Sequence, residues 1–152
     1  MKRILVPIDG SAASLNAARK AVEDAKLNNG EIIFVSVVKR LEIMGSGSET
    51  GYGYSVNFQN LNEAMIKDQT LMLGNMLSAL DLSDISYEKK VLVGNPSEEI
   101  LKYAEDCMCD LIVIGRRGFS KFKRFFLGSV TQRVISDAPC PVLVVNEEIT
   151  EE

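Results

Sequence analysis

The chain has 152 residues, of which 46% are hydrophobic and 25% charged, and its formal net charge is −4. That length fits one domain with a real core, and the negative charge argues against broad binding to nucleic acid or to anionic membranes. The first apolar run is too short for a signal peptide and no run approaches bilayer-spanning length, so we expect a cytoplasmic protein with no membrane partner. Reduced thiols are therefore expected for the three cysteines, and without any histidine a zinc site is not indicated.

The first part of the chain predicts two strands and a helix. Residues 4–8 form a short apolar run that ends at an Asp-Gly pair, as a buried parallel strand would. Ser11 is placed to cap a helix that runs to about residue 26, and alanines recur along it at helical spacing. Residues 32–38 form a second apolar run, which predicts the second strand.

The middle of the chain is expected to hold a long loop and then a helix. Residues 41–58 contain four glycines among Ser, Thr and Tyr, a composition typical of a flexible loop. Residues 61–80 follow with apolar side chains at helical spacing, which indicates a helix. Its expected apolar face contains Leu61, Met65, Met72, Met76 and Leu80.

The second half continues the alternation of strands and helices. Residues 86–93 carry charges in their middle, as an edge strand should. The segment at 95–98 has a capping asparagine, a proline in the first turn and a glutamate three residues after the cap, so it predicts a helix start. The other expected elements are the rest of that helix to about residue 108, a strand at 110–114, a helix at 129–137, a strand at 142–145 and a frayed acidic tail at 147–152.

Strands that alternate with helices predict an α/β fold with one parallel sheet and helices on both faces. We expect a single domain over residues 1–146 and, from right-handed crossovers, an open five-stranded sheet of order 3-2-1-4-5. In that order the chain reverses direction between strands one and four, and such sheets bind ligands in the crevice at the carboxyl ends there. The turn at Asp9 and the glycines from Gly115 onward should both reach this crevice, although they are far apart in sequence.

A glycine motif follows the fourth predicted strand. Gly115 and Gly118 are followed, after nine further residues, by Gly128-Ser129. Glycine lets a ligand approach main-chain N–H groups, and a helix that starts at Gly-Ser presents unpaired amides and the positive end of its dipole. These features favour an anion site, usually for phosphate. Asp9 and Gly128-Ser129 also have plainer readings, as a turn residue and as a helix cap provided by the Ser129 hydroxyl.

At these residues the chain resembles the universal stress protein family, whose ATP-binding subgroup carries Gly-x-x-Gly, nine residues, and then Gly-Ser or Gly-Thr. Residues 4–11, 94–96 and 139–145 match further landmarks of that family, so the resemblance covers essentially the whole chain. It implies a Rossmann-like fold of the adenine nucleotide alpha hydrolase-like kind. It also implies ATP or a related adenine nucleotide as ligand, alone or with Mg²⁺, and a homodimer through the strand at 142–145. Four apolar residues on a predicted sheet edge favour the same contact.

The resemblance further implies a set of nucleotide-binding residues. Asp9 would lie near the ribose or a phosphate-bound metal, with Pro7 beside it. The main chain of Val37 would face adenine, and Ile114 would pack near the ribose or base. The phosphates would contact the amides of Gly115, Gly118, Gly128, Ser129 and Val130 and the Ser129 hydroxyl. No role follows for Arg116 or Arg117.

Efficient catalysis is not indicated. The glycine loop lacks the Gly-Lys-Ser or Gly-Lys-Thr of a Walker loop, and the chain has no histidine to act as a general base, so we predict neither catalytic residues nor a dedicated metal site. The basic and aromatic residues at 116–126 suit a loop folded onto the protein better than a nucleic-acid surface. We interpret the chain as a stress-response regulator that binds an adenine nucleotide and signals through conformation or partner choice. A slow Mg-dependent ATPase and an interaction module with a vestigial pocket are the alternatives.

Overall fold

The computed structural model describes residues 1–39, 51–116 and 127–146. Its elements follow in the order β1 (Arg3–Pro7), α1 (Ala12–Asn28), β2 (Glu31–Lys39), α2 (Gly51–Leu77), β3 (Ser86–Gly94), α3 (Pro96–Asp106), β4 (Leu111–Gly115), α4 (Ser129–Asp137) and β5 (Val142–Val145). The acidic tail at 147–152, residues 41–50 of the predicted loop and Gly118 lie outside the described residues.

The strands form one parallel sheet in the order β3-β2-β1-β4-β5, which confirms the predicted topology. From β1 the chain builds outward through β2 to β3, and it then crosses to the other side of β1 to add β4 and β5. The strands β3 and β5 are therefore the two edges of the sheet. Glu88, Lys89 and Lys90 of β3 are exposed, in agreement with the edge position predicted from their charges.

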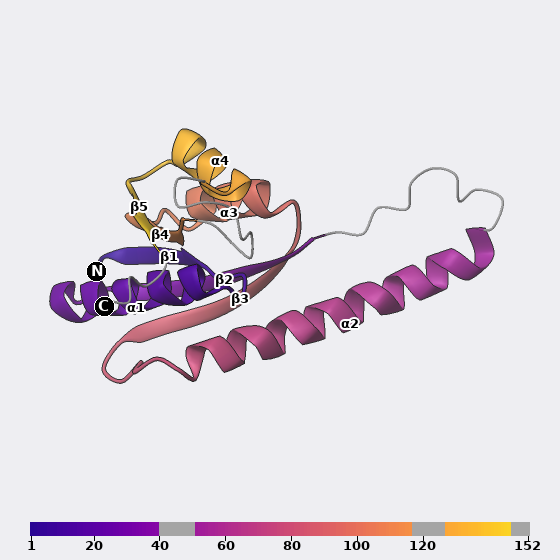
Figure 1. Ribbon diagram of the computed structural model, residues 1–152, viewed down its shortest axis with the longest axis horizontal. Helices are drawn as coiled ribbons and strands as arrows, with labels where there is room; N and C mark the ends of the chain where they lie inside the picture. The colour runs from indigo at the N-terminus through magenta and orange to yellow at the C-terminus, as the bar shows by residue number, and fades with distance from the viewer. Residues whose placement is uncertain (40–50, 117–126, 147–152) are drawn as a thin grey trace, which may run out of the picture.

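Helices cover both faces of the sheet (Figure 1). Alternate residues of the strands supply an apolar core on each face. Ile4, Val6 and Phe34 pack on the face that α1 and α2 cover, and the buried alanines of α1 allow this helix to lie close to the strands. Leu5 and Val35 pack on the opposite face, against α3 and α4. Because the central strands are buried on both sides, their sequences are continuous apolar runs.

The starts of α1 and α3 are set by side-chain acceptors, as the sequence predicts. The Ser11 hydroxyl oxygen accepts a hydrogen bond from the Ser14 amide at 3.2 Å, and the Asn95 side-chain oxygen accepts one from the Glu98 amide at 3.2 Å. Helix α1 ends at Asn29, whose φ of 51° and ψ of 49° lie in the left-handed region that closes many helices.

Helix α2 begins at Gly51, so the loop predicted over 51–58 is wrong and the helix starts earlier than residue 61. A glycine inside a helix costs only about 1 kcal/mol, and extending an existing helix adds one hydrogen bond per residue, so scattered glycines need not stop it. The predicted apolar face is also partly wrong. Among residues 60–77 of α2, Leu73 and Leu77 are buried, whereas Leu61 is exposed. The first part of α2 extends beyond the sheet (Figure 1).

In the described part of the chain, no helix combines the length and the apolarity needed to cross a bilayer.

Candidate functional site: the crevice between β1 and β4

The turn after β1 is fixed by hydrogen bonds to the start of α1. Asp9 is exposed, and its Oδ1 accepts a hydrogen bond from the Ser11 amide at 2.9 Å. Gly10 has a φ of 90°, which a side chain would resist, so a glycine is required in this turn. The Ser14 hydroxyl donates to the Ser11 carbonyl at 2.9 Å and stiffens the first turn of the helix. The Asp9 carboxylate is therefore held at the carboxyl end of β1.

The end of β4 lies directly against the start of α1. A Cβ added to Gly115 would stand 2.8 Å from the carbonyl carbon of Ala13, closer than real Cβ contacts allow. The Gly115 carbonyl accepts a hydrogen bond from the buried Thr131 hydroxyl of α4 at 2.8 Å. The last residue of β4 therefore joins the starts of two helices, and its lack of a side chain is explained first by the approach of α1.

Helix α4 starts beside the same strand end, and its start has no side-chain cap. The Gly128 amide donates to the Arg116 carbonyl at 3.0 Å, which places the helix start next to β4. Gly128 is the N-cap residue, and no side-chain cap hydrogen bond is present there. Its φ of −59° and ψ of 152° suit any residue, so the backbone does not demand glycine. Because Gly128 has no side chain, it supplies no capping oxygen to the amides of the first turn.

Ser129 is therefore not the helix cap that the plainer interpretation of Gly128-Ser129 assumes. It is the first residue inside α4 and is exposed. Capping needs a side-chain oxygen on the residue before the helix, where it can turn back to the amides of the second and third helical residues. A hydroxyl on the first helical residue instead lies at the rim of the helix start, beside the uncapped amides.

Strand β2 continues past the end of β1 and exposes main-chain groups toward the crevice. The pairing of the two strands ends at Pro7 opposite Val35, and the Val35 carbonyl accepts from the Ile8 amide at 2.8 Å. Main-chain groups of residues two apart in a strand point to the same side. The amide and carbonyl of Val37 therefore point toward the space that β1 would occupy if it were longer.

The predicted site residues thus gather from four elements. Pro7, Asp9 and Val37 come from the ends of β1 and β2, and Ile114 with Gly115 from the end of β4. Pro7 and Ile114 are buried at the carboxyl ends of β1 and β4. Val130 is half-buried in the first turn of α4, next to Ser129.

Sequence reasoning missed two polar residues that belong to this region, Ser36 and Gln69. The Ser36 hydroxyl donates to the Ile8 carbonyl at 2.6 Å, and Gln69 Nε2 of α2 donates to the Ser36 oxygen at 2.6 Å. A serine inside the apolar run of β2 was the available signal, because a buried hydroxyl needs a partner. Nothing in the sequence pairs it with a glutamine 33 residues later.

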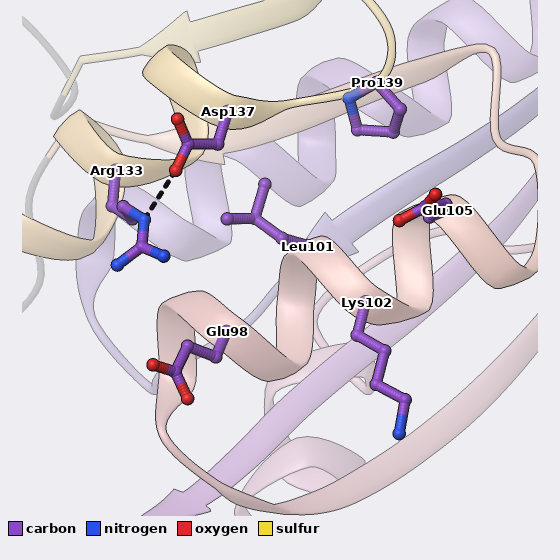
Figure 2. A pocket seen from close by; sticks show the side chains of 7 residues that line it. All are labelled: Glu98, Leu101, Lys102, Glu105, Arg133, Asp137 and Pro139. Carbon is purple, nitrogen blue, oxygen red and sulfur yellow. Dashed lines mark hydrogen bonds and ion pairs between the residues drawn. The ribbon is translucent and has the colours of Figure 1, made fainter.

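A separate hollow of about 470 Å³ lies between α3 and α4. Figure 2 shows the Arg133 and Asp137 side chains facing each other across one turn of α4, joined by an ion pair with 2.6 Å between Nε and Oδ2. Both signs of charge line this open hollow, and none of the predicted nucleotide-binding residues does. The crevice is therefore the better candidate site. The residues that line the hollow are Glu98, Leu101, Lys102, Glu105, Arg133, Asp137 and Pro139.

Metal ligation receives no support from the described parts of the chain. No group of three or more Asp, Glu and Cys side chains is placed there to hold an ion. The thiols of Cys107, Cys109 and Cys140 are free, and the sulfur atoms of the last two are 3.6 Å apart.

Known proteins match this chain along most of its length. The model of the universal stress protein family matches residues 1–146. Universal stress protein MJ0531 of Methanocaldococcus jannaschii is 33% identical over 146 residues, which cover 96% of this chain and 82% of that protein. The solved structure of the hypothetical protein MJ0577 from the same organism superposes with a TM-score of 0.81 and 28% identity, covering 98% of both chains.

A more distant solved structure carries a nucleotide. The universal stress protein family protein from Arabidopsis thaliana, solved with AMP bound, superposes with a TM-score of 0.62 and covers 97% of this chain and 93% of its own. Its sequence identity is 15%, so the likeness concerns the fold.

Proposed function

The chain belongs to the universal stress protein family, and on that premise we propose that it binds ATP or a related adenine nucleotide in the crevice between β1 and β4. The nucleotide acts as a regulatory ligand of a cytoplasmic stress-response protein. Its presence changes the conformation of the protein or its choice of partner. The Arabidopsis relative solved with AMP supports the proposal at the level of the fold.

The observation that carries the proposal is the contrast between the two helix starts at the crevice. Helix α1 is capped by its own Ser11, whereas α4 has glycine at its N-cap and no side-chain cap. Uncapped amides and the positive end of the helix dipole favour an anion from outside the helix. A phosphate group supplies the oxygen atoms that a capping side chain would otherwise provide.

The remaining residues are assigned from their places around that phosphate site. The amides of Gly128, Ser129 and Val130, with the Ser129 hydroxyl, hold phosphate oxygens. The nearby Gly115 and, outside the described residues, Gly118 complete the phosphate loop. At the other end of the crevice the Val37 main chain pairs with the edge of adenine. Asp9 meets the ribose or a phosphate-bound Mg²⁺, and Pro7 and Ile114 form the floor.

Two alternatives remain in the proposal. A slow Mg-dependent ATPase would rely on Asp9, because it is the carboxylate that the described residues hold at the turn after β1. Phosphate release that scales with protein concentration and is abolished by Asp9→Ala would favour this activity. An interaction module with a vestigial pocket would neither copurify with nucleotide nor bind it when added.

Two measurements test the proposal directly. Mass spectrometry of the small molecules released from freshly purified, denatured protein should detect an adenine nucleotide. Calorimetry should show ATP binding to the parent protein and at least tenfold weaker binding, about 1.4 kcal/mol, to Gly118→Val, whose side chain would obstruct the approach of phosphate. A folded Gly118→Val protein with parental ATP affinity would contradict the phosphate site.

A further inference from the structure

We infer that Ser36 and Gln69 are positioning residues that set the base and ribose end of the crevice and link helix α2 to its occupancy. This inference rests on the proposed function, since it concerns the same crevice. Its basis is a chain of hydrogen bonds that begins at the Ile8 carbonyl, passes through the Ser36 hydroxyl and ends at the Gln69 side chain. Three elements, β1, β2 and α2, meet in these bonds.

Each link of this chain has a defined direction. Ile8 and Ser36 are 2% and 1% exposed, so the Ile8 carbonyl has to find a partner inside the protein. A serine hydroxyl has one proton, which it donates to that carbonyl at 2.6 Å. Its oxygen is then left to accept, and the Gln69 amide nitrogen donates to it at 2.6 Å. Replacing Gln69 removes only the second of these hydrogen bonds, whereas replacing Ser36 removes both.

The bonds act where the nucleotide is proposed to bind. The Ile8 carbonyl and the Asp9 amide belong to the same planar peptide group. The hydrogen bond from Ser36 therefore fixes the orientation of this group, and with it the position of Asp9. Ser36 also directly precedes Val37, whose main-chain groups point into the crevice. One hydroxyl therefore sets the relative position of the two residues expected to meet ribose and adenine. Phosphate contacts, at the start of α4, lie on a different element.

Gln69 connects this region to the part of α2 that packs against the sheet. Leu73 and Leu77 are buried against the sheet, whereas Leu61 and Leu71 are exposed. Gln69 is half-buried and lies one turn before Leu73, so its bond to Ser36 adds a polar contact beside the apolar contacts of α2 with the sheet. A ligand that orders Asp9 and Val37 strengthens the bond to Gln69, and by linkage a docked α2 strengthens ligand binding.

The test uses Gln69→Leu with Thr70→Val as its matched control. Leucine keeps the size and helix propensity of residue 69 but removes the donor to Ser36. The Thr70 hydroxyl donates to Ile66 within α2 itself at 2.7 Å, so Thr70→Val also removes one hydrogen bond of the same helix without touching the crevice. Circular dichroism establishes that each variant is folded. If Gln69→Leu does not fold, Gln69→Met removes the same donor with a more adaptable side chain.

Calorimetry should show that Gln69→Leu weakens adenosine and ATP by the same factor, about three- to tenfold, as expected for one lost hydrogen bond. Thr70→Val should bind both ligands like the parent. Hydrogen exchange should show that ATP slows exchange along residues 60–77 in the parent and in Thr70→Val, and has no such effect in Gln69→Leu.

The outcomes separate this inference from the proposed function. A parent protein that binds neither ATP nor adenosine overturns both. ATP binding by the parent, with parental affinity and α2 protection in folded Gln69→Leu, overturns the positioning role alone. Loss of ATP affinity in a titration without Mg²⁺, with adenosine affinity unchanged, also overturns it, because the effect would then lie at the phosphate end.

Discussion

Gly115 packs against the backbone of Ala13 so closely that a Cβ on Gly115 would stand 2.8 Å from the Ala13 carbonyl carbon. This contact holds the start of α1 against the end of β4. Because the opposing atoms are main chain, they cannot move aside as a flexible side chain would. The glycine at this position is thus a packing requirement as well as part of the proposed phosphate loop.

Gly115→Ala should therefore destabilise the protein by about 1–3 kcal/mol, the usual cost of overpacking a close contact. Gly74→Ala is the matched control, since a Cβ at Gly74 in α2 meets nothing within 4 Å. It should stabilise the protein by about 0.5–1 kcal/mol, because alanine loses less chain entropy in a helix. Urea unfolding measures both effects. Equal stability of Gly115→Ala and the parent would mean that α1 and β4 are less tightly packed than the structure shows.

Ser129→Ala should separate phosphate binding from helix stability. Ser129 is inside α4 and is not its cap, so its substitution should change the unfolding free energy by less than about 0.5 kcal/mol. ATP affinity should fall about three- to tenfold because one hydrogen bond to phosphate is lost, whereas adenosine affinity should stay the same. A loss of about 1 kcal/mol in stability with unchanged ATP affinity would restore the capping role and remove the phosphate contact.

The homodimer that the sequence predicts through residues 142–145 is best tested at Leu143. Strand β5 is an edge of the sheet, and Val142 and Val144 pack against the core on the side of α3 and α4. Leu143 is 39% exposed, so Leu143→Lys adds a charge at the edge without disturbing that core. Light scattering should show a dimeric parent and a monomeric variant.

Leu27→Lys is the control for this substitution. Leu27 is 84% exposed on α1, and the variant should remain dimeric. A parent that is monomeric at micromolar concentration, or a dimeric Leu143→Lys protein, would rule out association through β5.

The buried thiol of Cys109 should make stability depend on alkaline pH. Burial, reinforced by the contact with the Cys140 sulfur at 3.6 Å, raises the pKa of the Cys109 thiol. In the unfolded chain the thiol ionises near its ordinary pKa of about 8.5, while the folded protein keeps the proton. The unfolding free energy should therefore be unaffected by this group below about pH 8 and should fall as the pH rises above it.

Urea unfolding between about pH 7 and 10 measures this dependence. Other groups also titrate in that range, so the difference between the parent and Cys109→Ala isolates the thiol. The decline should be shallower in the variant. Parallel pH profiles would show that Cys109 is not held in its neutral form by the fold.

The sheet order could be predicted because local signals and topology agree. Apolar runs such as residues 4–8 alternate with helical patterns, and right-handed connections leave few orders for five strands. Helix starts at Ser11 and Asn95 were predictable for the same reason, since a cap depends on residues three positions apart. The start of α2 was missed because glycines at 51 and 53 indicate a loop locally, whereas helix extension is cooperative.

The candidate site likewise has features that the sequence predicts and features that it does not. Its glycines and Asp9 are visible in the sequence because close backbone approach and tight turns restrict residue type. The role of Gly115 against Ala13, and the bonds from Gln69 through Ser36 to Ile8, depend on contacts between distant segments. A pattern of spacing contains no information about which buried hydroxyl meets which amide. These contacts became visible only in three dimensions.

Under the proposed function, the glycine at the start of α4 lowers the stability of the unliganded protein and leaves the helix start open to phosphate. The dihedral angles of Gly128 would accept aspartate, and a carboxylate there would be an internal imitation of the ligand. Without nucleotide, such a protein would be more stable by about 1 kcal/mol. It would not bind the nucleotide, because the carboxylate would occupy the phosphate position and repel the phosphate group. The proposed sensitivity to the nucleotide thus depends on the lack of a capping side chain at Gly128. Gly128 provides no side-chain cap for α4, and in the proposed complex the phosphate would supply those oxygen atoms.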